Sequence, residues 1–423
     1  MNIFLIVLLI INYIFYSFLD AGSLALLIGL SLFTYAGGRY VYHVKRTSHT
    51  DTKKICLAVI AVQVGVLCYF KYLSGASLPV GLSFYMLMAI SFIADVYRDE
   101  YSRFPSLTEV LVYISFFPTV ISGPIMKSKD MIPQLSARKK LTFGRVERAI
   151  WLLAAGVFMK FVMADRLSVA VDRVYEAPLV YSGITLFLTS VAYTLQLLFD
   201  FAGYSYMATA AASLLGYDIM ANFNLPYISA TPSEFWRRWH ISLSTWLRDY
   251  VYIPLGGSRK GKMRTYINIF LVMVISGLWH GSTVNFLIWG MLHGLGQVVH
   301  RFISENRKDT VKTPRILSMI ITFLFVNFLW IPFRMPTLAG AWTVFSRIVT
   351  LAPGAAYYYT YTFIFAGVLL LTEIAGIVRA NGNNPLKPLP LDTMYGRIAL
   401  CVLIIATGMF AYFGSGAFIY AQF

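Results

Sequence analysis

The sequence predicts an all-α protein that crosses a membrane many times. Of its 423 residues, 58% are hydrophobic and 13% are charged, whereas soluble domains average about 45–50% apolar and about 25% charged residues. Apolar runs close to the roughly 20 residues that cross a bilayer recur along the chain, and the polar stretches between them are short. These observations argue against a soluble enzyme, exclude a disulfide scaffold or a disordered chain, and predict a single membrane domain over residues 1–423.

The apolar runs predict about eleven membrane helices. The first run begins directly at the N-terminus without a basic region before it and is long for a signal peptide, so we expect it to remain as the first span. The expected spans are residues 3–18, 24–41, 55–72, 78–96, 149–164, 183–199, 266–278, 284–299, 316–331, 361–377 and 398–413.

A further apolar stretch, residues 110–125, is predicted to enter the membrane and turn back. It contains Pro118, Gly123 and Pro124, and such residues break helices. If it crossed, the basic loops before and after it would lie on opposite sides, against the tendency of basic loops to stay in the cytoplasm. Irregular backbone at membrane depth is tolerated where protein or a water-filled cavity covers it, so this break indicates a cavity.

The basic loops also predict the orientation of the chain. Loops 218–264, 301–315 and 379–397 are basic and expected in the cytoplasm, whereas the loops near 74–77 and 176–182 carry few charges and are expected outside. The N-terminus is then inside and the C-terminus outside. Residues 332–353 are too polar for a span and are expected along the outer interface.

The charge and cysteine content exclude several classes of partner. The formal net charge is +16, from 35 Lys and Arg against 19 Asp and Glu. Because cytoplasmic loops collect basic residues and anionic headgroups attract them, we expect membrane lipid, and no nucleic acid, as the charged partner. Cys56, Cys68 and Cys401 lie in apolar runs without a CxxC spacing and are interpreted as packing residues, and no HExxH motif occurs, so no metal site is expected.

Residues 222–264 are predicted to contain a short amphipathic helix. Thr231-Pro232-Ser233-Glu234 is a capping box with Pro at the first helical position, so the helix begins at about Pro232. At about 100° per residue, the aromatic and leucine residues share one side and four polar residues lie beside it. The apolar side comprises Phe235, Trp236, Trp239, Leu243, Trp246, Leu247 and Tyr250, and the polar stripe comprises Arg237, His240, Ser244 and Arg248. The helix either lies on the cytoplasmic leaflet or faces a cleft that handles an anionic substrate.

The loop after this helix resembles a phosphate-binding loop only in part. Gly256-x4-Gly261-Lys262 has the spacing, but Met263 stands where Ser or Thr would hold magnesium, and no strand precedes it. A nucleotidase is therefore rejected. An ordinary basic cytoplasmic loop is favoured over a flexible loop near a phosphate-bearing donor.

Two histidines lie in apolar sequence and are candidates for chemistry. His280 is flanked by Gly277 and Gly281, and His293 follows in the same stretch. An ionisable residue inside a bilayer is a functional candidate by default, and glycine allows close approach of a ligand or backbone. The alternative is that each is a neutral structural histidine, hydrogen-bonded between helices. This alternative is less favoured for His280 than for His293. No GxSxG nucleophile elbow occurs, so we expect a histidine base assisting transfer of an activated group to a hydroxyl. Asp200 is a further candidate at membrane depth.

Four blocks of sequence together resemble the membrane-bound O-acyltransferase family, in particular its alginate O-acetylation membrane proteins. Their order and spacing fit over about residues 81–300. The blocks are Ser122-Gly123-Pro124-Ile125; Phe199-Asp200-Phe201-Ala202-Gly203-Tyr204-Ser205; Glu234-Phe235-Trp236-Arg237-Arg238-Trp239-His240 through Ser244, Trp246, Arg248-Asp249-Tyr250 and Pro254-Leu255-Gly256-Gly257; and Gly277-Leu278-Trp279-His280-Gly281 followed by Leu292-His293-Gly294.

The resemblance implies acyl transfer through a central tunnel, from a cytoplasmic thioester to an acceptor across the membrane. His280 matches the family's catalytic histidine in the tunnel, and His240 matches a second functional histidine near the cytoplasmic entrance. Bacterial members acetylate secreted polysaccharides or cell-wall sugars, often with a separate extracytoplasmic acetyltransferase. The resemblance therefore implies a multi-pass protein of the bacterial cytoplasmic membrane, with that acetyltransferase or a polysaccharide export protein as partner.

The expected mechanism needs no bound cofactor, because acetyl-CoA or an acyl carrier thioester is the donor substrate. We expect a neutral His280 to take a hydroxyl proton as that oxygen attacks the thioester carbonyl. Arg237, Arg248 or Lys260 is expected near the donor's phosphates. The expected substrate- and donor-binding residues are Arg237, Ser244, Arg248, Trp279, Asn285 and Asp200.

Two other functions remain as alternatives at this point. The first is D-alanyl transfer to teichoic acid from a carrier protein. The related D-alanyl transfer proteins share the RWH and GxWHG blocks but lack the Pro-Leu-Gly-Gly stretch. This chain has that stretch, which favours acetylation. The second is a transporter or flippase without chemistry. Its signature would be paired broken helices in two halves, whereas here the breaks and histidines concentrate in one central block.

Overall fold

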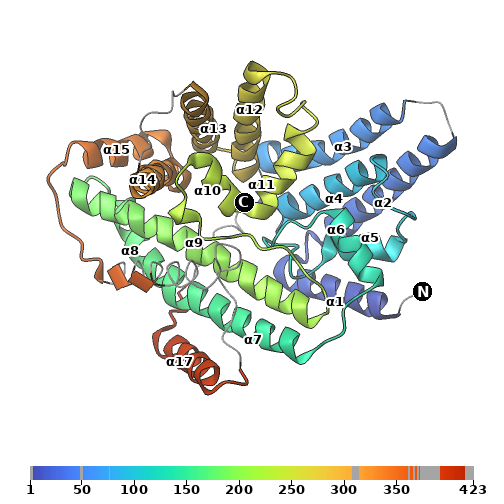
Figure 1. Ribbon diagram of the computed structural model, residues 1–423, viewed down its shortest axis with the longest axis horizontal. Coiled ribbons are helices and arrows are strands. Elements are labelled where there is room, and N and C mark those ends of the chain that lie inside the picture. The colour runs from blue at the N-terminus through green and yellow to red at the C-terminus, as the bar shows by residue number, and fades with distance from the viewer. Residues whose placement is uncertain are drawn as a thin grey trace. The chain divides into compact units, whose positions relative to one another are not determined.

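In the residues that it describes, the computed structural model consists of helices joined by turns and loops, with an isolated bridge between Tyr181 and Ala355. The residues that it describes are 3–47, 51–75, 77–306, 314–360, 363–364, 367–368, 371 and 391–414. Within them, the chain divides into two compact units, one within residues 1–152 and 205–220 and the other within 153–204 and 221–419. The prediction of an all-α membrane protein is confirmed (Figure 1).

The first unit is organised around α4. Its helices are α1 (Ile3–Asp20), α2 (Leu24–Thr47), α3 (Thr52–Cys68) with a π-helical extension (Tyr69–Leu73), α4 (Leu82–Tyr97), α5 (Leu107–Ser115), α6 (Ser128–Ser136), the first part of α7 (Phe143–Val157) and the C-terminal part of α9 (Gly183–Leu214). Nearly every residue of α4 is buried, and α2, α3, α5 and α6 pack against it. A helix that is apolar on all sides belongs in the interior, which explains this place for α4.

The stretch predicted to turn back in the membrane is broken after nine helical residues. α5 ends at Ser115, and turns follow. At about 1.5 Å per residue α5 is about 13.5 Å long, less than half of a bilayer core. Asn12 on α1 fixes the break, since its side chain donates to Ser115 Oγ (3.3 Å) and accepts from Phe117 N–H (3.1 Å). Gly81 is required here because its φ is +72° and a Cβ would lie 2.1 Å from the Val120 carbonyl oxygen. The orientation of the segment stays a prediction.

The second unit carries the histidines. Its elements are the rest of α7, the π-helical η2 (Phe158–Ala164), α8 (Asp165–Glu176), the N-terminal part of α9, η3 (Pro226–Ile228), α10 (Pro232–Arg238), α11 (Ile241–Leu247), the π-helical η4 (Arg248–Tyr252), α12 (Lys262–His280), α13 (Val284–Asn306), α14 (Arg315–Arg334), α15 (Leu338–Val349) and α17 (Met394–Phe410). The closest pairing is between α12 and α13, which stand side by side in Figure 1. A Cβ on Gly277 would lie 2.3 Å from the Phe286 carbonyl oxygen, and one on Gly290 would lie 2.4 Å from that of Met273. The two backbones therefore meet at glycines.

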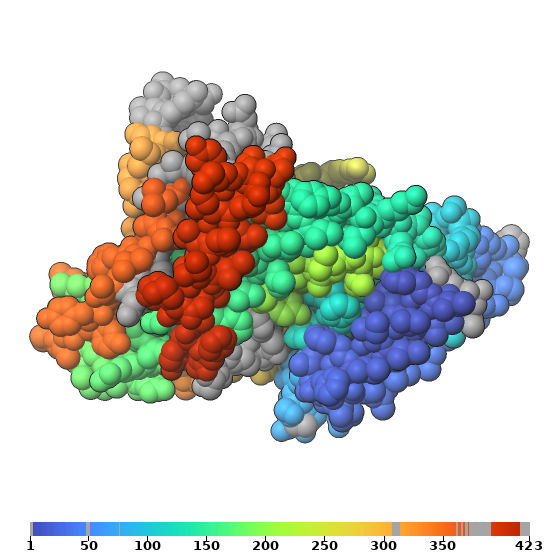
Figure 2. Space-filling view, turned by 90° about the horizontal axis from the view of Figure 1, so that it is seen from below, coloured from blue at the N-terminus to red at the C-terminus, as the bar shows by residue number. Residues whose placement is uncertain are grey.

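Five helices of the described residues are long and apolar enough to cross a membrane: α1, α2, α3 with its extension, α9 and α14. The number of about eleven crossings stays a prediction, and most of the expected span 361–377 lies outside the described residues. Shorter apolar helices are α4, α15 and α17. Figure 2 shows α17, in red, along the surface of its unit, and its Val402 and Met409 side chains are exposed. A surface of this kind is suited to lipid rather than water.

The cysteines differ in their environment. Cys56 is buried, which agrees with its interpretation as a packing residue. Cys68 and Cys401 are exposed, so the same interpretation is wrong for these two residues. Both lie on apolar helices whose outward faces carry other apolar side chains. None of the three forms a disulfide.

Candidate active site

α12 places His280 at its last residue. Gly281 follows in an extended conformation and ends the helix. The His280 Nδ1 lies 2.7 Å from the Ser276 carbonyl oxygen. A carbonyl oxygen only accepts hydrogen bonds, so Nδ1 carries a proton. Burial favours the neutral imidazole, in which Nε2 then carries the lone pair. The sequence thus builds a neutral imidazole whose Nε2 is able to accept a proton.

Aromatic rings surround His280 on several sides. The ring centroids of Trp279 and Trp289 both lie 4.8 Å from that of His280, and that of Phe333 lies 5.7 Å away. His280 itself is 1% exposed. Because the α12–α13 contact is made through glycines, α13 comes close enough for Trp289 to form one of these walls.

His240 lies in a break between two helices, and the single amphipathic helix predicted here is wrong. α10 ends at Arg238, Trp239 is extended, and His240 has φ 43° and ψ 53°, a left-handed conformation that costs energy in a residue with a side chain. Asn222 holds the break, since its backbone oxygen accepts from Ile241 N–H (2.9 Å) and its side-chain oxygen accepts from Ser242 N–H (3.3 Å). The predicted start of the helix at Pro232, capped by the Thr231 hydroxyl, is confirmed.

The break brings His240 toward His280. Their ring centroids are 6.4 Å apart, and Trp279 lies 6.1 Å from His240 and 4.8 Å from His280. On its other side, His240 packs edge-on against Phe201 at 4.6 Å. Burial first, and the neighbouring His280 second, hold the pKa of His240 well below its ordinary value. His240 is therefore neutral at pH 7.

His293, a sequence candidate for chemistry that the predicted set of site residues does not include, joins the same aromatic cluster. Trp236 Nε1 donates to His293 Nδ1 at 3.3 Å, so the proton of this imidazole is on Nε2, which has no hydrogen-bond partner among the described residues. Trp289 lies between the two histidines, with its ring 4.8 Å from His280 and 4.9 Å from His293. The spacing of Trp289 and His293 is the feature of the sequence that could have predicted this position of His293, because residues four apart share a helix face. We define the histidine cluster as His240, His280, His293, Trp236, Trp279 and Trp289.

The predicted binding residues fall into two groups. Trp279 lies in the cluster, whereas Arg237 and Arg248 are exposed, and Arg248 pairs with Asp249 at 2.7 Å. Ser244 and Asn285 bind backbone carbonyls instead: Ser244 Oγ donates to Trp239 O at 3.3 Å, and Asn285 Nδ2 donates to Met335 O at 2.6 Å.

Asp200 belongs to a second buried polar group. Lys160 Nζ lies 2.7 Å from Asp200 Oδ1 and 2.9 Å from Asp165 Oδ1, and all three side chains are 6% exposed or less. We call these three residues the ion cluster. Asp200 is linked to the histidines through the chain, because the next residue, Phe201, packs on His240.

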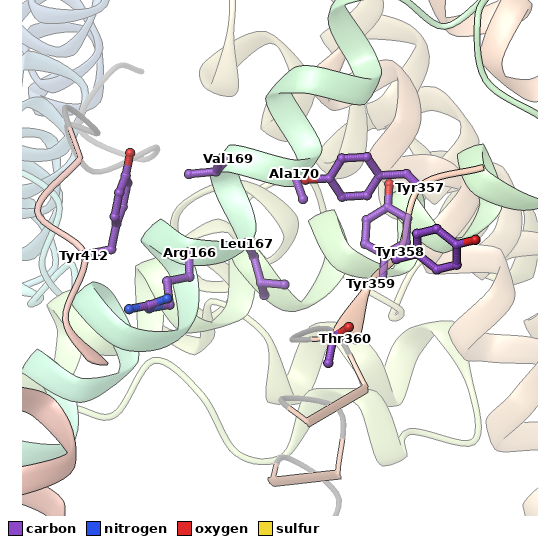
Figure 3. A pocket seen from close by; sticks show the side chains of 9 residues that line it. All are labelled: Arg166, Leu167, Val169, Ala170, Tyr357, Tyr358, Tyr359, Thr360 and Tyr412. Atoms are coloured by element: carbon purple, nitrogen blue, oxygen red, sulfur yellow. The ribbon is translucent and has the colours of Figure 1, made fainter. Parts of the chain in front are cut away.

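Two cavities of the second unit lie away from the predicted site residues. A cavity of about 260 Å³ is lined by residues of α8 and by tyrosines of a later loop (Figure 3). Its lining is Arg166, Leu167, Val169, Ala170, Tyr357, Tyr358, Tyr359, Thr360 and Tyr412. A second cavity, between α13 and α14, has a volume of about 730 Å³. No group of three metal-ligating side chains is found among the residues that the structure describes.

Comparison with known proteins agrees with the four sequence blocks. Residues 8–335 match the model of MBOAT, the membrane-bound O-acyltransferase family. Probable alginate O-acetylase AlgI of Pseudomonas aeruginosa is 36% identical over 364 residues, which cover 81% of this chain and 69% of that protein. A peptidoglycan O-acetyltransferase of Helicobacter pylori is 31% identical over 382 residues, covering 80% and 72%. A teichoic acid D-alanyltransferase of Streptococcus thermophilus is 31% identical over 271 residues, covering 57% and 65%.

Proposed function

The chain belongs to the membrane-bound O-acyltransferase family, and from this premise we propose that it moves an acetyl group from cytoplasmic acetyl-CoA to a hydroxyl of an extracytoplasmic polysaccharide or cell-wall polymer. It is an integral membrane protein of bacteria and an O-acyltransferase. The proposal adds the donor, the acceptor, the route across the cytoplasmic membrane and the residues. A transporter without chemistry is set aside, because the relatives are named as acyl-transferring enzymes.

The geometry of His280 is the observation that carries the mechanism. Its Nδ1–H is committed to the Ser276 carbonyl, which leaves the Nε2 lone pair as the basic site. In the proposed reaction, an acceptor hydroxyl gives its proton to Nε2 as its oxygen bonds to the thioester carbonyl carbon. The C–S bond then breaks, and the departing thiolate takes the proton from the imidazolium to give free CoA. The thioester is consumed, an ester is formed, and His280 returns to its neutral form. A positioned base of this kind contributes about 10²–10⁴-fold to a rate.

The other residues receive supporting roles in the proposal. His240 and Trp279 contact the reacting groups beside His280, because their rings lie within 6.4 Å of its ring. Arg237, Arg248 and Lys260, all exposed, meet the phosphates of the donor. Ser244 and Asn285 act as positioning residues through the carbonyls that they bind, and Asp200 acts through Lys160 and Phe201.

The acceptor and partner are proposed from the relatives' names. Alginate and peptidoglycan are both polymers of sugars outside the cytoplasm, and the proteins named for their acetylation cover 81% and 80% of this chain. The D-alanyltransferase match covers 57%, so D-alanyl transfer from a carrier protein is the second candidate. A separate extracytoplasmic acetyltransferase, or a polysaccharide export protein, is the proposed partner.

Thioester cleavage by the purified full-length protein tests the proposal. The protein is incubated in detergent with radiolabelled acetyl-CoA, with and without alginate or peptidoglycan fragments, and free CoA thiol is measured. A parallel reaction offers D-alanyl carrier protein. We expect CoA release that requires His280. Release of D-alanine without cleavage of acetyl-CoA would show that the D-alanyl carrier protein is the donor. Cleavage of neither thioester would contradict the proposal.

A further inference from the structure

The cavity between α13 and α14 is large and lies apart from the residues proposed for chemistry. Its volume is about 730 Å³, and Ala230 and Pro232, just before and at the start of α10, line it together with the two helices. Its long walls are apolar, formed by Leu292, Leu295 and Val299 of α13 and by Ile321 and Phe325 of α14. We call this cavity the α13–α14 groove.

The groove changes from apolar to polar along its length. α13 and α14 pack against each other and are antiparallel, since a short connection joins the end of one to the start of the other. Leu292 and Phe325 form one end, and His300, Ser304 and Ser318 line the other. From Leu292 to Ser304 the helix rises about 18 Å. A hydrocarbon chain that ends in a polar group matches this gradient.

The polar end carries an excess of positive charge. Beside this end, though not among the lining residues, ion pairs connect four basic side chains to two carboxylates: Arg238 and Arg315 approach Glu234, and Lys262 and Arg301 approach Glu305. Four positive and two negative charges leave a net charge of +2. Arg301 and Arg315 remain 39% and 68% exposed, so both are able to meet an anionic group. Basic clusters at a membrane surface attract anionic lipids.

We propose that the α13–α14 groove binds one acyl chain of an anionic membrane phospholipid, with its headgroup phosphate at Arg301 and Arg315. The exposed apolar walls face the lipid phase of this integral membrane protein, since Leu295 and Val299 are about half exposed. The end of the acyl chain rests on Phe325, whose ring centroid lies 5.7 Å from that of His293. The bound lipid thus supports one wall of the histidine cluster. The proposal does not depend on the identity of the donor or the acceptor.

Lipid retention by the purified full-length protein tests this site without an activity measurement. The delipidated protein in mild detergent is titrated with phosphatidylglycerol or with phosphatidylcholine of the same chains, and bound lipid is counted by native mass spectrometry. Val299→Trp fills the groove. Met291→Trp is the matched control, because Met291 is an exposed residue of α13 outside the groove. We expect the wild type to bind one phosphatidylglycerol. Val299→Trp should bind it with about tenfold lower affinity, a difference of roughly 1.4 kcal/mol. Met291→Trp should bind it with the affinity of the wild type.

The headgroup is tested by a second pair of variants. Arg301→Gln combined with Arg315→Gln is expected to abolish the preference for phosphatidylglycerol over phosphatidylcholine, whereas Arg39→Gln, at an exposed residue of α2, leaves it intact. Equal binding of the two lipids by the wild type would contradict an anionic headgroup site. Unchanged retention in Val299→Trp, or an equal loss in Met291→Trp, would show that the groove does not hold the chain.

Discussion

The histidine cluster and the ion cluster are both buried in the second unit, yet they hold their polar groups in different ways. In the histidine cluster, a neutral imidazole donates to a carbonyl at Ser276 and another accepts from the indole of Trp236. In the ion cluster, Lys160 lies between the carboxylates of Asp165 and Asp200 at 2.9 and 2.7 Å. The first arrangement needs no charge, whereas the second depends on the positive charge of Lys160, which the two carboxylates share.

This difference separates chemistry from stability. A neutral imidazole with its Nδ1–H engaged keeps a basic lone pair at low cost, because burial favours the uncharged form. A buried lysine between carboxylates has its donors committed, and removing one partner leaves uncompensated charge in a medium that solvates it poorly. We therefore expect removal of the His240 or His280 imidazole to act mainly on turnover, and substitutions in the ion cluster to act mainly on folding.

The largest expected stability effect is that of Lys160→Met. It leaves Asp165 and Asp200 without their shared cation, and breaking a buried ion pair on one side costs about 3–5 kcal/mol. The thermal unfolding midpoint in detergent should fall sharply. CoA release per folded molecule should fall much less, because Lys160 acts on the site only indirectly, through Asp200 and Phe201. Lys53→Met, at an exposed residue of α3, is the control. A midpoint equal to that of the control would show that the ion cluster does not stabilise the fold.

Trp236→Phe is expected to have the next largest effect. The phenylalanine fills most of the space but removes the indole N–H that binds His293 Nδ1, and an unsatisfied buried acceptor costs about 1–3 kcal/mol. The unfolding midpoint measures the loss against Trp342→Phe, because Trp342 is 66% exposed. If the two variants have the same midpoint, the indole hydrogen bond contributes nothing to the cluster.

His240→Gly and His240→Ala separate the backbone at the break from the imidazole. Both remove the ring, so both should lose turnover by a similar factor. Alanine still pays roughly 1–2 kcal/mol for the left-handed conformation at φ 43°, whereas glycine does not, so the glycine variant should unfold at a higher temperature. Equal midpoints would indicate that the chain leaves this conformation when the histidine is removed.

The smallest expected effect is a dependence of stability on pH. Because the pKa of His240 in the folded protein is held well below its ordinary value of 6.5, the unfolded chain binds this proton first as pH falls. Its contribution to stability is complete above pH 6.5 and is lost below it. The unfolding midpoint of the wild type should therefore fall more steeply below pH 6.5 than that of His240→Asn. Parallel curves would contradict a neutral, buried His240.

Local signals in the sequence predicted part of this arrangement. Pro118 and Gly123 marked the broken segment after α5, and Pro232 marked the start of α10, because each acts through its own backbone geometry. The apolar sequence around His280 predicted its burial, and the blocks shared with the family placed His240 and His280 in one site.

The remaining features depend on contacts between distant residues. The helix break at His240 is held by Asn222, and helical periodicity across Trp239 gave no sign of it. Trp236 and His293 are 57 residues apart, and Lys160 and Asp200 are 40 apart. Such pairs form only when α10 packs on α13, or η2 on α9, so a pattern within one helix does not reveal them.

The central claim is that His280 is the base of acyl transfer and is not needed for folding. The initial rate of CoA release from acetyl-CoA, measured for wild type, His280→Ala and the exposed control His43→Ala, tests it most directly. We predict a fall of about 10²–10⁴-fold for His280→Ala, an unfolding midpoint close to that of the wild type, and full activity for His43→Ala. A His280→Ala protein that releases CoA at the wild-type rate would contradict the account.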